Sequence, residues 1–424
     1  MLLLTIAILS SLAVVNYVAG GKSLFHPAVV FCSVWAVDLL LIWMAGDFFY
    51  PLSIETLCIF VGGALVFSLG SALAFLVPQR KPAEQNKVLS QASNRIISIL
   101  TVLVVCAAPF AFGWMVRAAA QHSGENFLVS AVRAMLDENV QASLGYALFG
   151  NTVSLSLLVA LVAFRESDSG KKRAFLAILL AFALALLTGA RSGITTLTFS
   201  LLCLDWLKNR RVRWKLLVTM GLIFLVLMSA VAMLVKIEAE PSASVTANAA
   251  PVLRSLMLYA GGGLVAFDRL VREPNTVPFA WHITRGLFQM LNKLGGKFEV
   301  QSLHAEFTNI GPHSLNTNVY TFYFAYLEYG YTVMMIIVFI LAFLITICYR
   351  KAINGGRVAA LLYSMLFAYL MVTIFNENFF TNVSFLFKLC LLCAVIYGLP
   401  GWHATFRRFI SQDVAADLSA GRAK

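Results

Sequence analysis

Charged residues are scarce in this chain of 424 residues: aspartate, glutamate, lysine and arginine together make up 12%, whereas 60% of the residues are hydrophobic. The mean hydropathy is +0.82. A water-soluble domain carries far more polar surface than this, so the composition excludes a soluble globular protein. Repeated apolar runs of about 20 residues, the length of helix that crosses a bilayer, predict an all-α, polytopic integral membrane protein.

Several motifs of metal and nucleotide sites are also missing. The chain has no Asp-x-Asp pair, no His-x-x-x-His spacing and no Walker-type glycine loop. We therefore expect no dedicated metal site, no cofactor and no coupling to ATP. The seven cysteines lie mostly inside apolar runs and none falls within 236–316, so we expect no disulfide framework in that polar stretch.

About eleven membrane spans are expected from the apolar runs. They cover residues 2–19, 27–45, 54–77, 96–117, 142–164, 174–187, 193–207, 216–235, 331–348, 358–375 and 383–399. With no internal repeat, residues 1–424 are expected to form a single transmembrane domain.

Basic residues give the orientation of these spans. The net charge of +12 could suggest nucleic acid, but the basic residues form short clusters between apolar runs, and alternate loops hold 21 of the 32 lysines and arginines. Such alternation is typical of loops that face the cytoplasm. We therefore expect no nucleic-acid partner, an outward N-terminus and a cytoplasmic tail over 400–424.

The loops on the other side of the membrane include one long segment, 236–330. Within it, Pro251–Val271 is predicted to form a helix with Gly261-Gly262-Gly263 near its middle, and a second helix is predicted near Asn318–Glu328. Residues 118–141 are expected to form a short interfacial helix. The long segment is predicted to cap a site on the outward face.

An arginine-bearing turn, Thr188–Gly193, separates two apolar runs that are each too short to cross a bilayer comfortably. The turn should therefore lie at one membrane face or slightly inside it. An arginine at such a depth is unfavourable unless it is used, so Arg191 is predicted to handle an anionic substrate. The peptide N–H groups of Ser192 and Gly193 would begin the next helix and add an anion-binding helix terminus.

The outward loops are unusually rich in cations for a side that is normally depleted in them. These are Arg191, Arg254, Arg269, Arg272 and Arg285, with Lys293 and Lys297. Guanidinium groups bind phosphate through two parallel hydrogen bonds. The alternative is that single arginines reach to lipid headgroups or pair with acidic neighbours such as Asp268 and Glu273.

Histidines are skewed outward as well. In the stretch Gly311–Asn318 a turn is followed by His313, with Asn316, Asn318 and Tyr320 close by in sequence. A histidine near its ordinary pKa can take a proton from an attacking hydroxyl. His313 is the histidine for which we favour this role, and the alternative for any of them is a turn residue without chemistry.

Two charges fall within spans and are functional candidates for that reason: Asp38 and Lys388. Lys388 lies about a turn and a half from an outward loop and could join the cationic site there, with Glu377 as its nearest acidic neighbour in sequence. Asp38 has a position but no assigned role.

Three sequence stretches resemble O-antigen polymerases of the Wzy type. Thr188–Gly193 is similar to the arginine motif of that family, and Asn318–Phe322 followed by Glu328-Tyr329-Gly330 is similar to the signature after its large periplasmic loop. The helix with Tyr259, the three glycines and Ala266-Phe267 resembles the first half of that loop. Glu328 replaces the aspartate that is common in the family.

The resemblance implies a glycosyltransferase of GT-C-like architecture in the bacterial inner membrane, with its site facing the periplasm. Its donor and acceptor would be oligosaccharides linked to undecaprenyl pyrophosphate, and membrane lipids, a chain-length regulator and a flippase would be its other partners. Arg191 would hold the pyrophosphate, with Arg254 and Arg285 as helpers and His313 as the base. Ser192, Gly193, Asn316, Asn318, Tyr320, Lys388, Arg269 and Arg272 would contribute to substrate binding.

Two other functions fit the same architecture. The first is an O-antigen ligase or another lipid-linked glycosyl or oligosaccharide transferase. Ligases transfer the polymer to lipid A core and commonly carry a His-Asn pair, whereas two residues separate His313 from Asn316. A transporter would show inverted repeats, but the segment 236–330 has no counterpart in the first half of the chain. We therefore favour the polymerase.

Overall fold

The computed structural model describes residues 1–79, 91–121, 143–187, 191–215, 249–273, 282–293, 295–298, 307–312, 315–317 and 320–398, with single positions between 127 and 140 and at 218 and 221. For Arg191, Arg254 and Asn316 only the backbone is described. Residues 188–190 and 399–424, His313, Asn318 and nearly all of the predicted span 216–235 lie outside the described residues.

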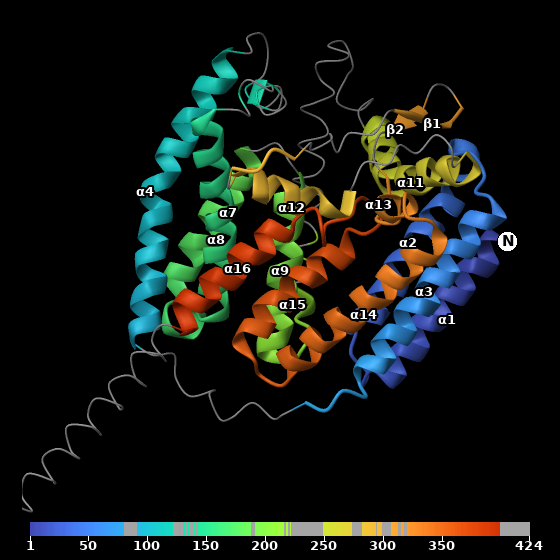
Figure 1. Cartoon of the computed structure of the whole chain (residues 1–424), viewed down its shortest axis with the longest axis horizontal. Coiled ribbons are helices and arrows are strands. Elements are labelled where there is room, and N and C mark those ends of the chain that lie inside the picture. The colour runs from blue at the N-terminus through green and yellow to red at the C-terminus, as the bar shows by residue number, and fades with distance from the viewer. Residues whose placement is uncertain are drawn as a thin grey trace, which may run out of the picture.

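The described chain is a bundle of helices with smaller elements covering one end (Figure 1). The bundle helices are α1 (Leu2–Ala19), α2 (Pro27–Ala45), α3 (Ile54–Ala74), α4 (Gln91–Gln121), α7 (Leu144–Arg165), α8 (Lys171–Leu187), α9 (Arg191–Asn209), α14 (Tyr331–Ile353), α15 (Arg357–Met371) and α16 (Val383–Cys393). Three single-turn segments, Gly46–Phe48, Ser167–Ser169 and the π-helical Ala394–Gly398, follow α2, α7 and α16. The covering elements are α11 (Ala249–Arg272), α12 (His282–Lys293), β1 (Thr308–Gly311), β2 (Leu315–Thr317) and α13 (Phe324–Leu327).

Six of the described helices are long and apolar enough to cross a membrane, namely α1, α2, α3, α4, α7 and α14. Helices α15 and α16 are apolar but shorter. Large apolar side chains such as Leu69, Phe110 and Phe175 are exposed on the outside of the bundle, where lipid would surround them. The structure is therefore that of a polytopic helical membrane protein, as the sequence predicted.

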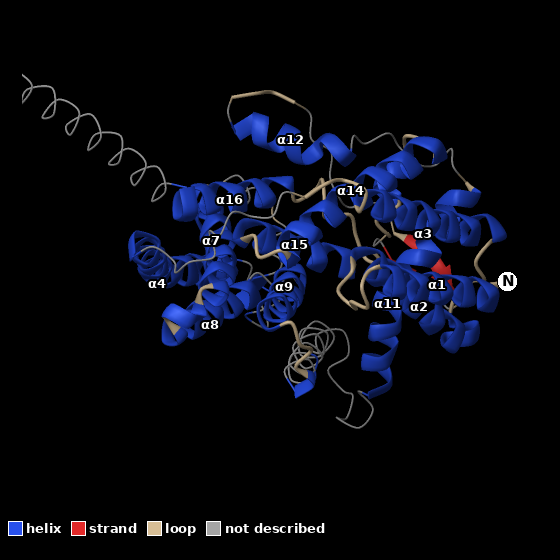
Figure 2. Cartoon of the chain, turned by 90° about the horizontal axis from the view of Figure 1, so that it is seen from below, coloured by secondary structure: helices blue, strands red, loops and turns tan. Residues whose placement is uncertain are grey.

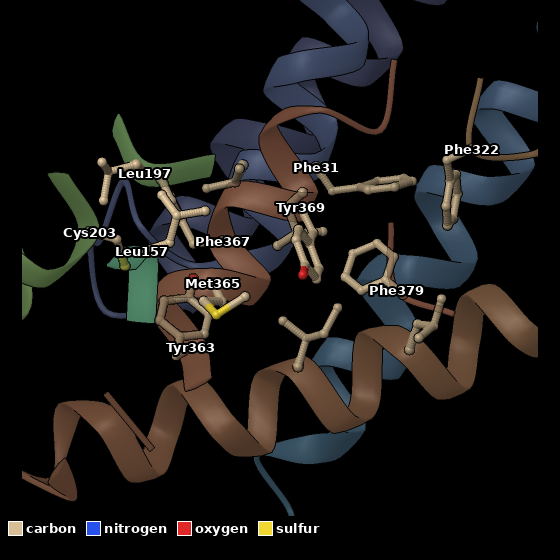
Figure 3. Close-up of a cluster of buried hydrophobic side chains, with 14 of the residues drawn as sticks. Phe31, Leu157, Leu197, Cys203, Phe322, Tyr363, Met365, Phe367, Tyr369 and Phe379 are labelled. Carbon is tan, nitrogen blue, oxygen red and sulfur yellow. The ribbon is translucent and has the colours of Figure 1, made fainter. Parts of the chain in front are cut away.

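Two groups of helices make up the bundle. Helices α1, α2, α3 and α14 pack together, as do α4, α7, α8 and α9, and α15 contacts members of both groups. Figure 3 shows side chains of α15, including Tyr363, Phe367 and Tyr369, within the buried cluster between the two groups. Lipid is as apolar as these side chains, so close packing, rather than escape from water, holds the groups together inside the bilayer.

A close contact between α3 and α14 illustrates this packing. A Cβ atom on Gly70 would lie 2.5 Å from the carbonyl oxygen of Phe339, so glycine is needed for the two backbones to approach. Next to it, the hydroxyls of Ser71 and Thr346 share a buried hydrogen bond of 2.8 Å. Small residues and hydroxyls of this kind are what join helices in a membrane.

The basic loops lie together at one end of the bundle, which we call the basic end. Arg173 donates to Ser98 Oγ at 2.8 Å, and Lys208 pairs with Asp168 at 2.7 Å. Arg350 donates to the carbonyl of Val77 at 2.8 Å. For the described loops, these contacts confirm that the alternate loops share one side.

The opposite end, which we call the loop end, carries α11, α12, α13 and the β1–β2 hairpin (Figure 1). The helix predicted over Pro251–Val271 is confirmed as α11. The prediction of a helix over Asn318–Glu328 is wrong: Tyr320 and Thr321 are not helical and only Phe324–Leu327 forms a helix. The reason is that the Phe322 N–H donates to the carbonyl of Thr373 at 2.9 Å, in a distant turn, rather than within a helix. The antiparallel hairpin was also not predicted.

Asp268 fixes α11 to the start of α3. Its carboxylate accepts hydrogen bonds from the N–H and Oγ of Ser53 at 2.7 and 2.6 Å and pairs with Arg272 at 2.7 Å. The Ser53 side chain in turn caps α3 by accepting from Thr56 N–H.

Asp268→Ala should therefore lower the stability of the purified protein by about 1–3 kcal/mol, because it leaves the partly buried N–H and hydroxyl of Ser53 without this acceptor. The thermal melting temperature in detergent measures this change. Asp47→Ala is the matched control, since Asp47 is exposed at the same end. Equal melting temperatures for the two variants would contradict the anchoring role.

Candidate active site at the loop end

Two of the helices that lead to the loop end, α8 and α15, are shorter than a helix that crosses a bilayer. Helix α8 has 17 residues, or about 26 Å at the helical rise, and α15 has 15 residues, or about 22 Å. A hydrocarbon core is about 30 Å thick. Both helices are therefore shorter than a full membrane span, and α9, which follows α8, packs against α15.

Arg191 is the first residue of α9, so the N–H groups of Ser192 and Gly193 lie in the first helical turn, as predicted. No acidic residue occupies that turn. The positive end of the helix dipole and the N–H groups at this terminus therefore favour an anion. Gly193 also allows α8 to come close, because its Cβ position is 3.4 Å from that of Ala185.

Arg285 lies in α12 and is the predicted catalytic residue whose side chain the structure describes. Its guanidinium is partly buried, and Nε and Nη1 have no hydrogen-bond partner among the described residues. Burial lowers the pKa of Arg285. A cation that is removed from water without a partner is unfavourable, so this arrangement suits a residue that awaits an anionic ligand.

The turn 372–382 is organised around Glu377, whose side chain is 2% exposed. Its carboxylate accepts hydrogen bonds from the N–H groups of Phe379, Phe380 and Thr381 and from the hydroxyl of Tyr326 in α13. Burial raises the pKa of Glu377, and the hydrogen bonds oppose that shift. From sequence alone Glu377 was only the acidic neighbour of Lys388, and no pattern of residue types indicates this set of backbone donors.

Lys388 lies one and a half turns into α16. Its Nζ donates to Asn151 Oδ1 of α7 at 2.9 Å. The lysine therefore bridges two helices just below the loop end.

Two predicted binding residues of α11 have different surroundings. Arg272 pairs with Asp268 and also donates to the carbonyl of Pro51 at 2.6 Å. This is the ion pair that was considered as the alternative for Arg272, and it gives the guanidinium a role in holding α11 in place. Arg269 is exposed on the same helix.

Tyr320 is buried where the chain leaves the hairpin. Its hydroxyl shares a hydrogen bond of 2.6 Å with Thr308 Oγ1 of β1, and its ring stacks on Phe324 with centroids 4.6 Å apart. These contacts join the hairpin to α13. Asn316 belongs to β2, whereas His313 and Asn318 lie outside the described residues.

The predicted cations do not converge on one point. Helix α12, with Arg285, packs on α13 and α16; α9 packs on α7, α8 and α15; and α11 packs on α2, α3 and the hairpin. In Figure 2, α15 lies between α9 and α12. The structure thus brings Arg285 and Lys388 to neighbouring helices and holds Arg269 and Arg272 on the other side of the bundle.

A family model matches most of the chain. The model of the family described as "Putative O-antigen polymerase" matches residues 23–387, which include α8, α9, the turn 372–382 and all the described covering elements. No curated protein and no solved structure matches the chain. Because the family model spans most of the sequence, the chain belongs to the O-antigen polymerase family.

Proposed function

We propose that this protein extends O-antigen by transferring the growing glycan from undecaprenyl pyrophosphate to the non-reducing end of a new lipid-linked repeat unit. Membership of the polymerase family supports a role in O-antigen polymerisation. The lipid carrier, the direction of transfer and the placement of the loop end in the periplasm of the inner membrane are parts of the proposal. So are the chain-length regulator and the flippase as partners.

The observation that carries the proposal is the position of Arg191 as the first residue of α9, at the loop end. In the reaction the acceptor hydroxyl oxygen attacks the anomeric carbon of the donor, and the bond from that carbon to the phosphate oxygen breaks. The electron pair moves to the pyrophosphate. A guanidinium and a helix N-terminus next to that group stabilise the developing charge.

The remaining proposed roles follow the same chemistry. Arg285, with two guanidinium nitrogens that have no partner among the described residues, is suited to a second phosphate contact, and Arg254 would assist. His313 or a nearby acid would accept the proton of the attacking hydroxyl. The proposed reaction needs no metal, because the arginines would supply the positive charge that stabilises the leaving pyrophosphate.

Arg191→Ala should abolish chain extension while the amount of protein in the membrane stays normal, because the leaving group loses its charge partner. Arg191→Lys should restore little activity, because the lysine ammonium cannot bind a phosphate through two parallel hydrogen bonds as a guanidinium does. Lipopolysaccharide gels of complemented deletion cells measure polymer length, and membrane immunoblots measure protein. Polymer of normal length in the alanine variant would refute the assignment.

The deletion strain separates polymerase from ligase. We expect single repeat units on lipid A core, because ligation proceeds without polymerisation. Core without any repeat, accompanied by polymer retained on the lipid carrier, would instead identify a ligase.

The loop end should be accessible from the periplasm. In spheroplasts, a membrane-impermeant maleimide should label Asp47→Cys at the loop end but label Lys172→Cys at the basic end only after permeabilisation. The unsubstituted protein, with its seven native cysteines, gives the background. The reverse labelling pattern would contradict the proposed orientation.

A further inference from the structure

The inner side of the turn 372–382 is fixed by a single carboxylate. Glu377 Oε1 lies 2.6 Å from Phe379 N, 2.9 Å from Phe380 N and 3.0 Å from the Tyr326 hydroxyl, and Oε2 lies 3.0 Å from Thr381 N. Three successive N–H groups of non-helical backbone are thereby satisfied. Buried N–H groups in a membrane protein cannot donate to water instead, so the conformation of the turn depends on the Glu377 side chain.

The outer side of the same turn supports α12. A Cβ atom on Gly286 would lie 2.6 Å from the carbonyl oxygen of Phe380 and 3.3 Å from that of Thr381. Only glycine allows this approach, because real Cβ atoms do not come within 3.0 Å of a neighbouring atom. The peptide units around Phe380 and Thr381 thus direct their N–H groups to Glu377 while their carbonyl oxygens face α12.

Arg285 is the residue next to this contact. Because Gly286 touches the turn directly, a shift of the turn moves the α12 backbone and the guanidinium with it. None of the described residues forms a hydrogen bond with Nε or Nη1 of Arg285, so within the described part of the chain those two atoms follow the position of the α12 backbone.

We propose that Glu377 is a positioning residue: together with Tyr326 it fixes the turn 372–382 as a platform for α12, and through Gly286 it sets the place at which Arg285 meets the pyrophosphate of the lipid-linked substrate. The identity of the ligand in this proposal rests on the proposed function. The platform itself follows from the contacts of Glu377 and Gly286.

Undecaprenyl pyrophosphate binding to the purified, detergent-solubilised protein tests the proposal. Gly286→Ala should push α12 away from Phe380 without weakening the helix, because alanine favours helix over glycine. Glu377→Gln should weaken the hydrogen bonds that the side chain accepts from the backbone N–H groups of the turn 372–382. Each should weaken binding roughly 10- to 100-fold, the loss expected when a hydrogen bond between charged groups is removed, and should match Arg285→Ala.

Gly113→Ala in α4 is the matched control, because a Cβ atom there meets open space. It should bind like the unsubstituted protein. If Glu377→Gln does not accumulate, Tyr326→Phe replaces it, since that variant removes one donor and keeps the ring.

Double variants distinguish positioning from general stability. In an Arg285→Ala background, Gly286→Ala and Glu377→Gln should weaken binding no further, because the group they position is gone. Additive losses, or unchanged binding in Gly286→Ala while Arg285→Ala is impaired, would overturn the proposal. Unchanged binding in Arg285→Ala would also overturn it. The proposed function is tested separately, by the length of the polymer that cells with the Arg191→Ala variant make.

Discussion

The requirement that every backbone polar group be satisfied inside the membrane governs this structure. Helices meet it by themselves, but a turn below the surface does not. The turn between α15 and α16 meets it with a buried carboxylate that accepts from three successive N–H groups. That arrangement permits irregular backbone in a buried turn, and irregular backbone is what exposes peptide groups and side chains to a substrate.

Helix length is the second determinant of the site. At 15 and 17 residues, α15 and α8 are shorter than the roughly 20 residues that cross a hydrocarbon core. The proposed function places the phosphates of the substrate near the ends of these two helices. Of the elements that cover the loop end, α11 lies on one side of the bundle and α12 on the other.

The sequence was informative where a local signal coincided with a structural boundary. The polar turn with two glycines before Ile194 predicted that a helix begins there, and α9 does begin at Arg191. The amphipathic stretch after Pro251 predicted α11 with an error of two residues at its start and one at its end. The alternation of basic loops predicted which loops share an end, because insertion is biased by local charge.

The rest depended on contacts between distant parts of the chain. The segment Tyr320–Tyr323 has aromatic residues that a helix accepts, yet the hydrogen bond from Phe322 to Thr373 holds it extended or in a turn. The partners of Glu377 are mostly backbone N–H groups, which every residue except proline has, so residue types give no sign of them. The location of Arg285 depends on the contact between Gly286 and Phe380, and a single glycine in a helix carries no such information.

The contact between α3 and α14 has a consequence for biosynthesis. Ser71 and Thr346 share a hydrogen bond although 275 residues separate them. At about 5–20 residues per second, the ribosome needs roughly 15–55 s to make the intervening chain. During that interval α3 is in the membrane with Gly70 and a hydroxyl facing lipid instead of α14. Until α14 is made, the side of α3 that it covers stays exposed. A chaperone or protease of the membrane has that time in which to recognise the first three helices.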